Sequence, residues 1–183
     1  MRAMIIEHTG GPEALRLADV PTPEPGPGQV LIRVACAGVN PADWKDREGM
    51  LAMYVAYRFP YILGFDAAGV VERVGPGVEH PRPGDRVFTP GNHGQGAWGS
   101  YAEFMVADAD RTAIIPPSMS FAAAASIPVA ALTGWQGLFD RGGLQAGQRI
   151  MIHGGSGGLG SFAVQFARWA GARVAATCGT ANV

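Results

Sequence analysis

The chain is 183 residues long, 48% hydrophobic and carries a net charge of −1, which allows one or two domains with a full core and gives no basic surface for nucleic acid. No apolar run is long enough for a membrane span, and residues 1–7 turn polar too soon for a secretory signal. The only two cysteines, Cys36 and Cys178, exclude a disulfide framework and a zinc-ligand spacing, so a reducing, cytoplasmic location is expected.

Short alternating segments separated by glycine- and proline-rich turns fill residues 1–117. Strands are expected within residues 1–7, 15–20, 29–39, 61–75, 83–88 and 100–106. Asn40 begins a short helix, with Asn40 or Asp43 as its cap. His93, in the glycine-rich loop 91–99, is expected to face solvent. Many short strands with such turns predict a compact β-barrel.

The composition shifts after Pro117, where we place the domain boundary. Ser118 or Ser120 can cap a helix over residues 121–127, and a second helix is expected over residues 130–139. The sequence thus predicts two domains, residues 1–117 and residues 118–183.

A glycine-rich turn lies between a predicted strand and a predicted helix. Residues 149–153 are short and apolar, as in a buried strand, and the spacing Gly155-x-Gly157-x-x-Gly160 follows. Residues 173–177 predict a second, parallel strand. The intervening helix has the apolar residues Phe162, Phe166 and Trp169, with Val164 and Ala163 between them, a spacing that suits packing on a sheet. Strand, glycine turn, helix and strand are the start of a dinucleotide-binding unit.

Each glycine of this turn has a physical role in binding a dinucleotide. Gly155 allows the tight turn, Gly157 leaves room for a pyrophosphate at the backbone, and Gly160 lets the helix approach the strand. The first helical amides then point at the phosphates. A purely structural glycine turn is the alternative. A dinucleotide domain normally has about six parallel strands, and only two are visible, so the chain is expected to be truncated or completed by another polypeptide.

Several separated motifs resemble the medium-chain dehydrogenase/reductase superfamily. Residues 64–78, followed by residues 83–87, are similar to its hallmark segment. The resemblance implies a mixed α/β protein. It has a GroES-like β-barrel catalytic domain (1–117) and the first part of a Rossmann dinucleotide-binding domain (118–183).

Zinc alcohol dehydrogenases of this superfamily carry a cysteine ligand and a Gly-His-Glu motif where this chain has Asn40 and Phe65-Asp66. Asn and Phe cannot replace a thiolate and an imidazole on zinc. The chain is therefore more similar to the zinc-free quinone oxidoreductases, the zeta-crystallin-like group. This implies NADPH-dependent reduction of quinones or α,β-unsaturated carbonyls. A zinc-dependent alcohol dehydrogenase with displaced ligands and a non-catalytic fragment remain alternatives.

The resemblance also implies the site residues. Asn40 and Tyr54 are the candidate catalytic residues; the group's usual tyrosine position holds Leu51 here, and Tyr57 is the other possible substitute. The candidate cofactor contacts are Asn40, Asp43, Thr133, Ser156, Gly157, Gly158, Leu159, Gly160, Thr177, Cys178, Gly179 and Thr180. Because no acidic residue stands at 177–180 to bind ribose hydroxyls, NADP(H) is favoured. No metal site is expected, a homodimer is expected at full length, and the 183-residue chain alone is expected to be inactive.

Several of these residues also have simpler roles. Asn40 can be only a helix cap. Asp43 can be structural, paired with Lys45 or Arg47. His153, at the end of the first nucleotide strand, is expected to be structural, and Trp98, Trp135 and Cys36 are expected in the core.

Overall fold

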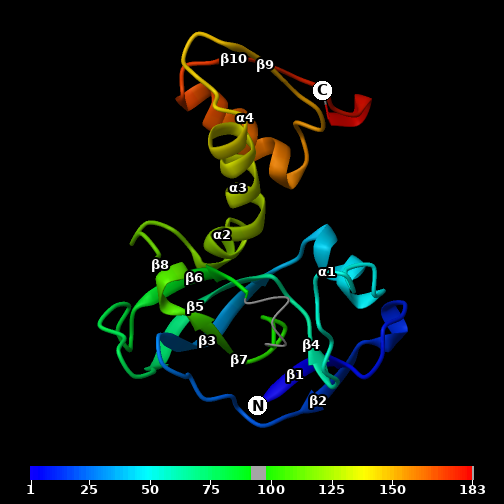
Figure 1. Cartoon of the computed structure of the whole chain (residues 1–183), viewed down its shortest axis with the longest axis vertical. Coiled ribbons are helices and arrows are strands. Elements are labelled where there is room, and N and C mark those ends of the chain that lie inside the picture. The colour runs from blue at the N-terminus through cyan, green and yellow to red at the C-terminus, as the bar shows by residue number, and fades with distance from the viewer. Residues whose placement is uncertain (92–97, 183) are drawn as a thin grey trace. The chain divides into compact units, whose positions relative to one another are not determined.

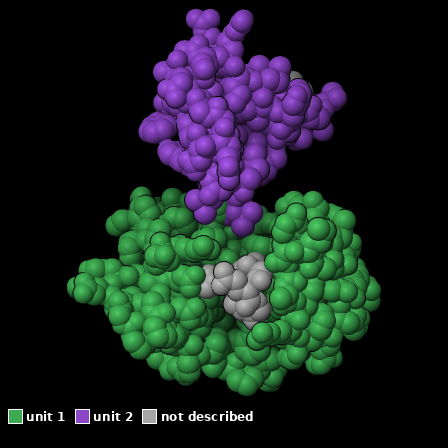
Figure 2. All heavy atoms as spheres, viewed as in Figure 1, with its two compact units in different colours: residues 1–128 green, residues 129–183 purple. Residues whose placement is uncertain are grey.

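A computed structural model describes residues 1–91 and 98–182. Two compact units, residues 1–128 and 129–183, make up the chain (Figure 2). His93 and Val183 lie outside the described residues. The boundary was predicted near Pro117, and unit 1 extends to Pro128. The assignment of residues 118–183 to a dinucleotide domain stays a prediction.

The larger sheet of unit 1 has five antiparallel strands (Figure 1). In spatial order they are β7 (Phe104–Asp108), β3 (Gln29–Gly38), β5 (Asp66–Val74), β6 (Arg86–Pro90) and β8 (Ala113–Ile114). Alternate residues of β3, Val30 and Ile32, join Val71, Val87 and Met105 in one buried cluster. Leu31, between Val30 and Ile32, is also buried, so both faces of β3 are covered at this point.

A three-stranded sheet completes the barrel. Its order is β2 (Arg16–Asp19), β1 (Arg2–Ile6) and β4 (Tyr61–Ile62), and the single-turn helix η1 (Pro12–Ala14) precedes β2. An isolated bridge joins Ala3 to Ala102. The predicted compact β-barrel is confirmed.

One predicted strand begins later than expected. Residues 100–106 alternate, but β7 starts at Phe104. The amides of Ser100 and Tyr101 instead donate to the carbonyls of Gly64 and Leu63. The segment before Phe104 is thus tied to the loop after β4.

Two helices accompany the barrel. α1 (Pro41–Arg47) follows β3 with Asn40 as its N-cap, as predicted. α2 (Phe121–Ala125) is capped by Ser120, whose hydroxyl accepts from the amide of Ala123. Ala124 and Ala125 of α2 are buried in a cluster with Ala68 of β5. The helix η2 (Ala109–Arg111) follows β7.

Unit 2 has the predicted strand, turn, helix and strand. β9 (Arg149–Ile152) and β10 (Arg173–Ala176) pair in parallel, and α4 (Gly158–Trp169) connects them (Figure 1). α3 (Pro128–Trp135) continues into the π-helix η3 (Gln136–Arg141), and η4 (Thr180–Asn182) follows β10.

The predicted packing face of α4 is confirmed for Ala163, Val164 and Phe166, which pack in one cluster with β9, and is wrong for Trp169. The buried residues of α4 are Gly160, Ala163 and Ala167, and the two alanines share a cluster with Ile152 of β9. The larger Trp169 is 75% exposed, and Trp135 is not in the core. Small side chains let the helix lie close to the strands. The aromatic rings instead contact one another: Trp135, Phe139, Phe162, Phe166 and Trp169.

Candidate functional site

The junction between β3 and α1 places Asn40. Its backbone is extended, and its amide donates to Asp43 Oδ2 at 2.6 Å. The other carboxylate oxygen of Asp43 accepts from the amide of Phe65 at 3.1 Å. The buried Asp43 thus joins the start of α1 to the loop before β5. Arg47 forms an ion pair with Glu48 at 2.9 Å.

The side chain of Asn40 points to a second carboxylate. Its Nδ2 donates to Asp66 Oδ2 at 2.8 Å, and Asp66 is 1% exposed. Asp66 is the first residue of β5 and is the register partner of Gly38. Asp66 was noted in the sequence only at the Gly-His-Glu position of the hallmark segment and was not predicted as a site residue. Its place in that segment was the signal that could have found it.

Asn40 also lines a pocket of about 300 Å³ in unit 1. The other lining residues are Leu15, Val39, Asp43, Trp44, Arg47, Leu63 and Tyr101. Apolar side chains with a small group of polar ones suit a compact, flat ligand whose polar atoms must be oriented. Of these residues, sequence analysis proposed only Asn40 and Asp43 for the site. The others come together through the fold.

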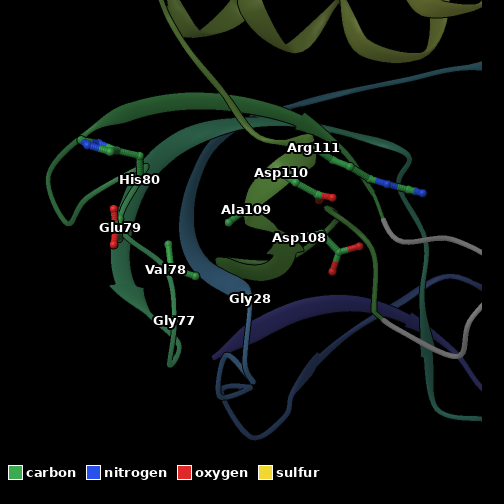
Figure 3. A pocket seen from close by; sticks show the side chains of 9 residues that line it. All are labelled: Gly28, Gly77, Val78, Glu79, His80, Asp108, Ala109, Asp110 and Arg111. Carbon is green, nitrogen blue, oxygen red and sulfur yellow. The ribbon is translucent and has the colours of Figure 1, made fainter.

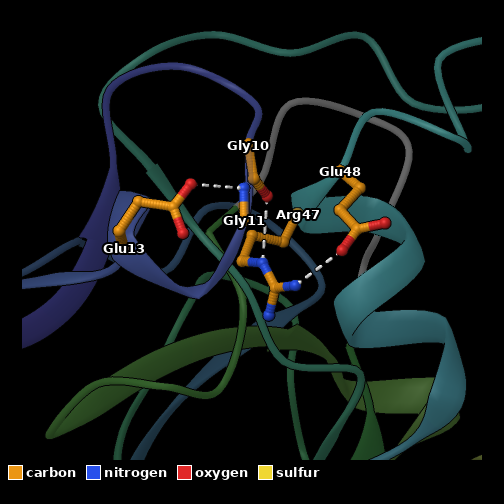
Figure 4. Close-up of polar contacts among 5 residues, drawn as sticks. All are labelled: Gly10, Gly11, Glu13, Arg47 and Glu48. Carbon is orange, nitrogen blue, oxygen red and sulfur yellow. Dashed lines mark hydrogen bonds and ion pairs between the residues drawn. The ribbon is translucent and has the colours of Figure 1, made fainter.

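Arg47, which lines this pocket, is held by polar contacts with its neighbours (Figure 4). Its Nε donates to the carbonyl of Gly10 at 3.1 Å, and the amide of Gly10 donates to the carbonyl of Arg47 at 2.9 Å. The amide of the next residue, Gly11, donates to Glu13 at 3.0 Å. The loop before β2 is therefore tied to the end of α1.

The two candidate tyrosines differ in their surroundings. The hydroxyl of Tyr57 donates to the backbone carbonyl and to Oδ1 of Asp46, at 2.8 and 2.7 Å. Its ring is stacked on Phe59. Tyr54 is 78% exposed. Tyr57 thus has a structural role in holding the buried Asp46, and Tyr54 is the tyrosine whose hydroxyl is accessible.

Buried tyrosines make unit 1 sensitive to alkali. Burial of Tyr61, which is 0% exposed, is the main reason that the pKa of its hydroxyl lies well above its usual value. The negative charge of Asp46 raises this pKa further. When folding raises the pKa of a group, its protonated form contributes stability. This contribution is fully present below the pKa of the unfolded state and is lost as the pH rises from there toward the pKa of the folded state. Above about pH 10, the free energy of unfolding should therefore fall by about 1.4 kcal/mol per pH unit for this residue. Urea denaturation at several pH values should give a shallower pH slope for Tyr61→Phe, and an unchanged slope would contradict this.

The glycine turn of unit 2 is closely packed on one side. A Cβ atom on Gly160 would overlap the carbonyl oxygen of Gly154 and lie 2.8 Å from the Cα of Gly155. A Cβ on Gly155 would lie 2.7 Å from the side chain of Ala176. These two glycines are thus required by the packing of turn, helix and strand. Close packing was predicted for Gly160, whereas Gly155 was predicted to allow the tight turn.

The other side of the turn is open. A Cβ on Gly158 would meet nothing within 4 Å, and α4 begins at this residue with a cap, Gly157, that makes no side-chain hydrogen bond. In the described chain, the amides of Gly158, Leu159 and Gly160 donate to no acceptor. Three unpaired backbone amides at the N-terminus of α4 can donate to phosphate oxygens, and Gly158, which has no side chain, leaves space beside them. This arrangement suits a diphosphate group.

The segment after β10 is joined to this turn. The hydroxyl of Thr177 accepts from the amide of Gly154 at 3.2 Å and lies 3.3 Å from His153 Nδ1. The amide of Gly155 donates to the carbonyl of Thr177 at 2.8 Å. The remaining candidate cofactor contacts of unit 2 are exposed: Thr133, Ser156, Cys178, Gly179 and Thr180. The structure therefore groups Thr177 and His153 with the turn. From the sequence, a structural role was expected for His153 in preference to a catalytic one.

A cavity of about 660 Å³ lies elsewhere in unit 1 (Figure 3). Its lining residues are Gly28, Gly77, Val78, Glu79, His80, Asp108, Ala109, Asp110 and Arg111. None of the predicted site residues is among them. The cavity is therefore not the candidate site.

Solved structures of related proteins match both units. One is the quinone oxidoreductase from Coxiella burnetii, with 35% identity, a TM-score of 0.90, and coverage of 100% of this chain and 57% of that one. Another is a mycobacterial protein complexed with NADPH, with 36% identity, a TM-score of 0.86, and coverage of 99% and 54%. The predicted fold, a GroES-like barrel followed by part of a Rossmann-like sheet, is confirmed.

Curated relatives match the chain over almost its whole length. Quinone oxidoreductase from Lama guanicoe is 40% identical over 98% of this chain and 53% of its own length. A chloroplastic quinone-oxidoreductase homologue from Spinacia oleracea is 38% identical over 96% of this chain and 54% of its own. The chain thus spans about half the length of the curated relatives that it matches. The predicted resemblance to the quinone oxidoreductase group is confirmed.

The expected cytoplasmic location is wrong. The relatives from Spinacia oleracea, Triphysaria versicolor and Arabidopsis thaliana are all named as chloroplast proteins. A low cysteine count indicates only a reducing environment, which is not unique to the cytoplasm.

Two further findings bear on the class of protein. Among residues 1–91 and 98–182, no helix is both long and apolar enough to cross a membrane. The family model of the alcohol dehydrogenase GroES-like domain matches residues 26–117, which is half of the chain. The chain therefore belongs to the alcohol dehydrogenase GroES-like domain family, within the medium-chain dehydrogenase/reductase superfamily.

Proposed function

We propose that the polypeptide carrying this chain reduces quinones or α,β-unsaturated carbonyls with NADPH and without zinc. The observation that carries the proposal is the group of three unpaired amides at Gly158, Leu159 and Gly160 beside an open turn. The quinone oxidoreductase names of the relatives support the substrate class. The apolar pocket beside Asn40 is compatible with a flat ring.

NADP(H) is the proposed form of the cofactor. The segment 177–180 offers small and hydroxyl side chains, and an NAD-specific unit would place a carboxylate there. One structural relative is complexed with NADPH, and another is named as an NAD-dependent alcohol dehydrogenase. The proposed cofactor contacts are the turn from Ser156 to Gly160 and the segment from Thr177 to Thr180, with Asn40, Asp43 and Thr133 as further candidates.

The chemistry needs orientation more than acid–base groups. When bound, a nicotinamide would supply a hydride to the β-carbon of an enone or to a quinone. One proton from solvent would then balance the saturated carbonyl or, after any tautomerisation, the hydroquinone. The chain contributes a pocket that can orient the ring. The amide of Asn40 and the accessible hydroxyl of Tyr54 are the proposed polar contacts.

A zinc-dependent alcohol dehydrogenase is the second candidate. The residues at the expected ligand positions argue against it, because the Asn40 amide donates to Asp66 and the neighbouring Phe65 has no metal-binding atom. A homodimer at full length stays a prediction.

The oxidation of NADPH by a quinone tests the proposal. The natural polypeptide that contains these residues should oxidise NADPH when menadione is added, and a zinc chelator should not reduce the rate. A rate that depends on added zinc would favour the alcohol dehydrogenase. No oxidation with quinones or enones would contradict the proposal, and an NADPH titration of the 183-residue chain would then test the non-catalytic alternative.

Gly158→Ala should separate cofactor binding from folding. The added methyl group meets no protein atom within 4 Å, so the midpoint of urea denaturation should not fall. It occupies the space proposed for the diphosphate, so the Kd for NADPH should rise at least about tenfold. Gly137→Ala, which also adds a methyl group to open space in a helix, is the matched control. Unchanged NADPH affinity in Gly158→Ala would contradict the proposed position of the diphosphate.

A further inference from the structure

We propose that Asp66 is a positioning residue that fixes the orientation of the Asn40 amide, an inference that rests on the proposed function. The Nδ2 of Asn40 lies 2.8 Å from Asp66 Oδ2. A carboxylate only accepts hydrogen bonds, whereas an amide has one donor end and one acceptor end. Turning the amide over would bring two oxygens together. Asp66 therefore selects one orientation of the amide.

The fold gives Asp66 a dedicated place. Asp66 is 1% exposed and begins β5 opposite Gly38, the last residue of β3. A Cβ on Gly38 would overlap the carbonyl oxygen of Ala125 and lie 2.9 Å from the Cβ of Asp66. Only a glycine at position 38 leaves room for both the carboxylate and α2. The carboxylate is thus held where the Asn40 side chain must meet it.

The selected orientation decides what Asn40 offers to a ligand. With Nδ2 at Asp66, the amide oxygen is the end turned toward the backbone amide of Asp43, with which the Asn40 side chain forms the capping box of α1. An amide oxygen has two lone pairs, so one remains for a ligand. A hydrogen bond to a charged acceptor also polarises the amide and strengthens its oxygen as an acceptor. Asn40 lines the pocket of about 300 Å³. In this orientation its amide oxygen can accept a hydrogen bond from a hydroxyl or a carboxamide N–H of a bound molecule, and it cannot stabilise an oxyanion.

The simpler explanation is that Asp66 only stabilises the fold, and two variants separate the explanations. Asp66→Asn keeps the shape but allows either orientation of the Asn40 amide. Asp46→Asn is the matched control, because Asp46 is also a buried aspartate of unit 1 and accepts from Tyr57 instead. The double variant N40D/D66N restores a hydrogen bond with its donor and acceptor exchanged.

The first measurement is NMR of the Asn40 side-chain amide, assigned through its loss in Asn40→Asp. In the wild type, its protons should be shifted and slow to exchange. In Asp66→Asn the shift and the protection should be lost, and in Asp46→Asn they should remain. This readout does not depend on turnover, so it tests the inference even if the polypeptide fails to reduce quinones. Unchanged Asn40 resonances in Asp66→Asn would overturn the inference.

The second measurement is steady-state kinetics with NADPH and menadione in the natural polypeptide. Asp66→Asn should lower kcat/KM about tenfold more than Asp46→Asn does, at a comparable midpoint of urea denaturation. N40D/D66N should recover stability but not activity. Equal losses in Asp66→Asn and Asp46→Asn, or recovery of activity in the double variant, would overturn the positioning role.

Discussion

Replacing Gly160 with alanine is expected to disrupt unit 2. The new Cβ would overlap the carbonyl oxygen of Gly154 and lie 2.8 Å from its carbonyl carbon and from the Cα of Gly155. All three are backbone atoms, so no side-chain rotation relieves the overlap, and the turn must open. We expect a loss of about 3 kcal/mol or more, at the upper end for overpacking in a core.

Hydrogen exchange of the β9 and β10 amides measures this effect locally. In Gly160→Ala the exchange of these amides should become much faster, because the contact of α4 with the strands depends on the close approach at Gly160. Gly158→Ala is the control, since it adds a methyl group two residues earlier without contact. Equal protection in the two variants would show that the turn tolerates a side chain at Gly160.

Replacing Asp43 with alanine should destabilise unit 1 strongly. Its carboxylate accepts from the amides of Asn40 and Phe65, at 2.6 and 3.1 Å, and is buried. Its removal leaves two partly buried amides without an acceptor. Each unsatisfied amide lowers the free energy of unfolding by about 1–3 kcal/mol. We expect the free energy of unfolding to fall by about 3 kcal/mol, measured by urea denaturation.

Asp85→Ala is the matched control for this prediction. Asp85 Oδ2 accepts from the amide of Arg82, three residues earlier, at 2.7 Å, as Asp43 does from Asn40, but in an exposed position. Water can replace the lost acceptor there, so the cost should be about 1 kcal/mol. Similar losses for the two variants would mean that burial does not govern the role of Asp43.

The parts of the fold that could be predicted from the sequence depend mostly on residues that are close together in the chain. The strand, glycine turn and helix around Gly155–Gly160 follow from short-range rules: a tight turn, an unpaired helix start and a close helix–strand contact. The cap at Asn40 has the same origin, since an extended asparagine before Pro41 begins a helix. Such features depend on neighbours in sequence.

The errors have a different cause. Trp169 was predicted on the packing face of α4 but is exposed, whereas Phe166 packs against the cluster as predicted. The fully buried positions are Ala163 and Ala167, because closeness to the strands favours small side chains. Periodicity alone does not say which of two apolar faces meets a sheet.

The partners of the site could not be predicted for a related reason. The link from Asn40 to Asp66 joins residues 26 positions apart, and that from Tyr57 to Asp46 joins residues 11 apart. Both depend on how β3, α1 and β5 are placed by the barrel. The sequence indicated that Asn40 and a tyrosine belong to the site. It did not indicate that the Tyr57 hydroxyl donates to Asp46 or that the Asn40 amide donates to Asp66.

The most direct test of the proposed diphosphate position is hydrogen exchange at the turn with and without NADPH. The amides of Gly158, Leu159 and Gly160 have no acceptor in the described chain, so they should exchange rapidly in the free natural polypeptide. Bound NADPH should slow their exchange strongly, because phosphate oxygens then accept from them. If NADPH binds and these three amides still exchange at their free rates, the diphosphate lies elsewhere and the account is contradicted.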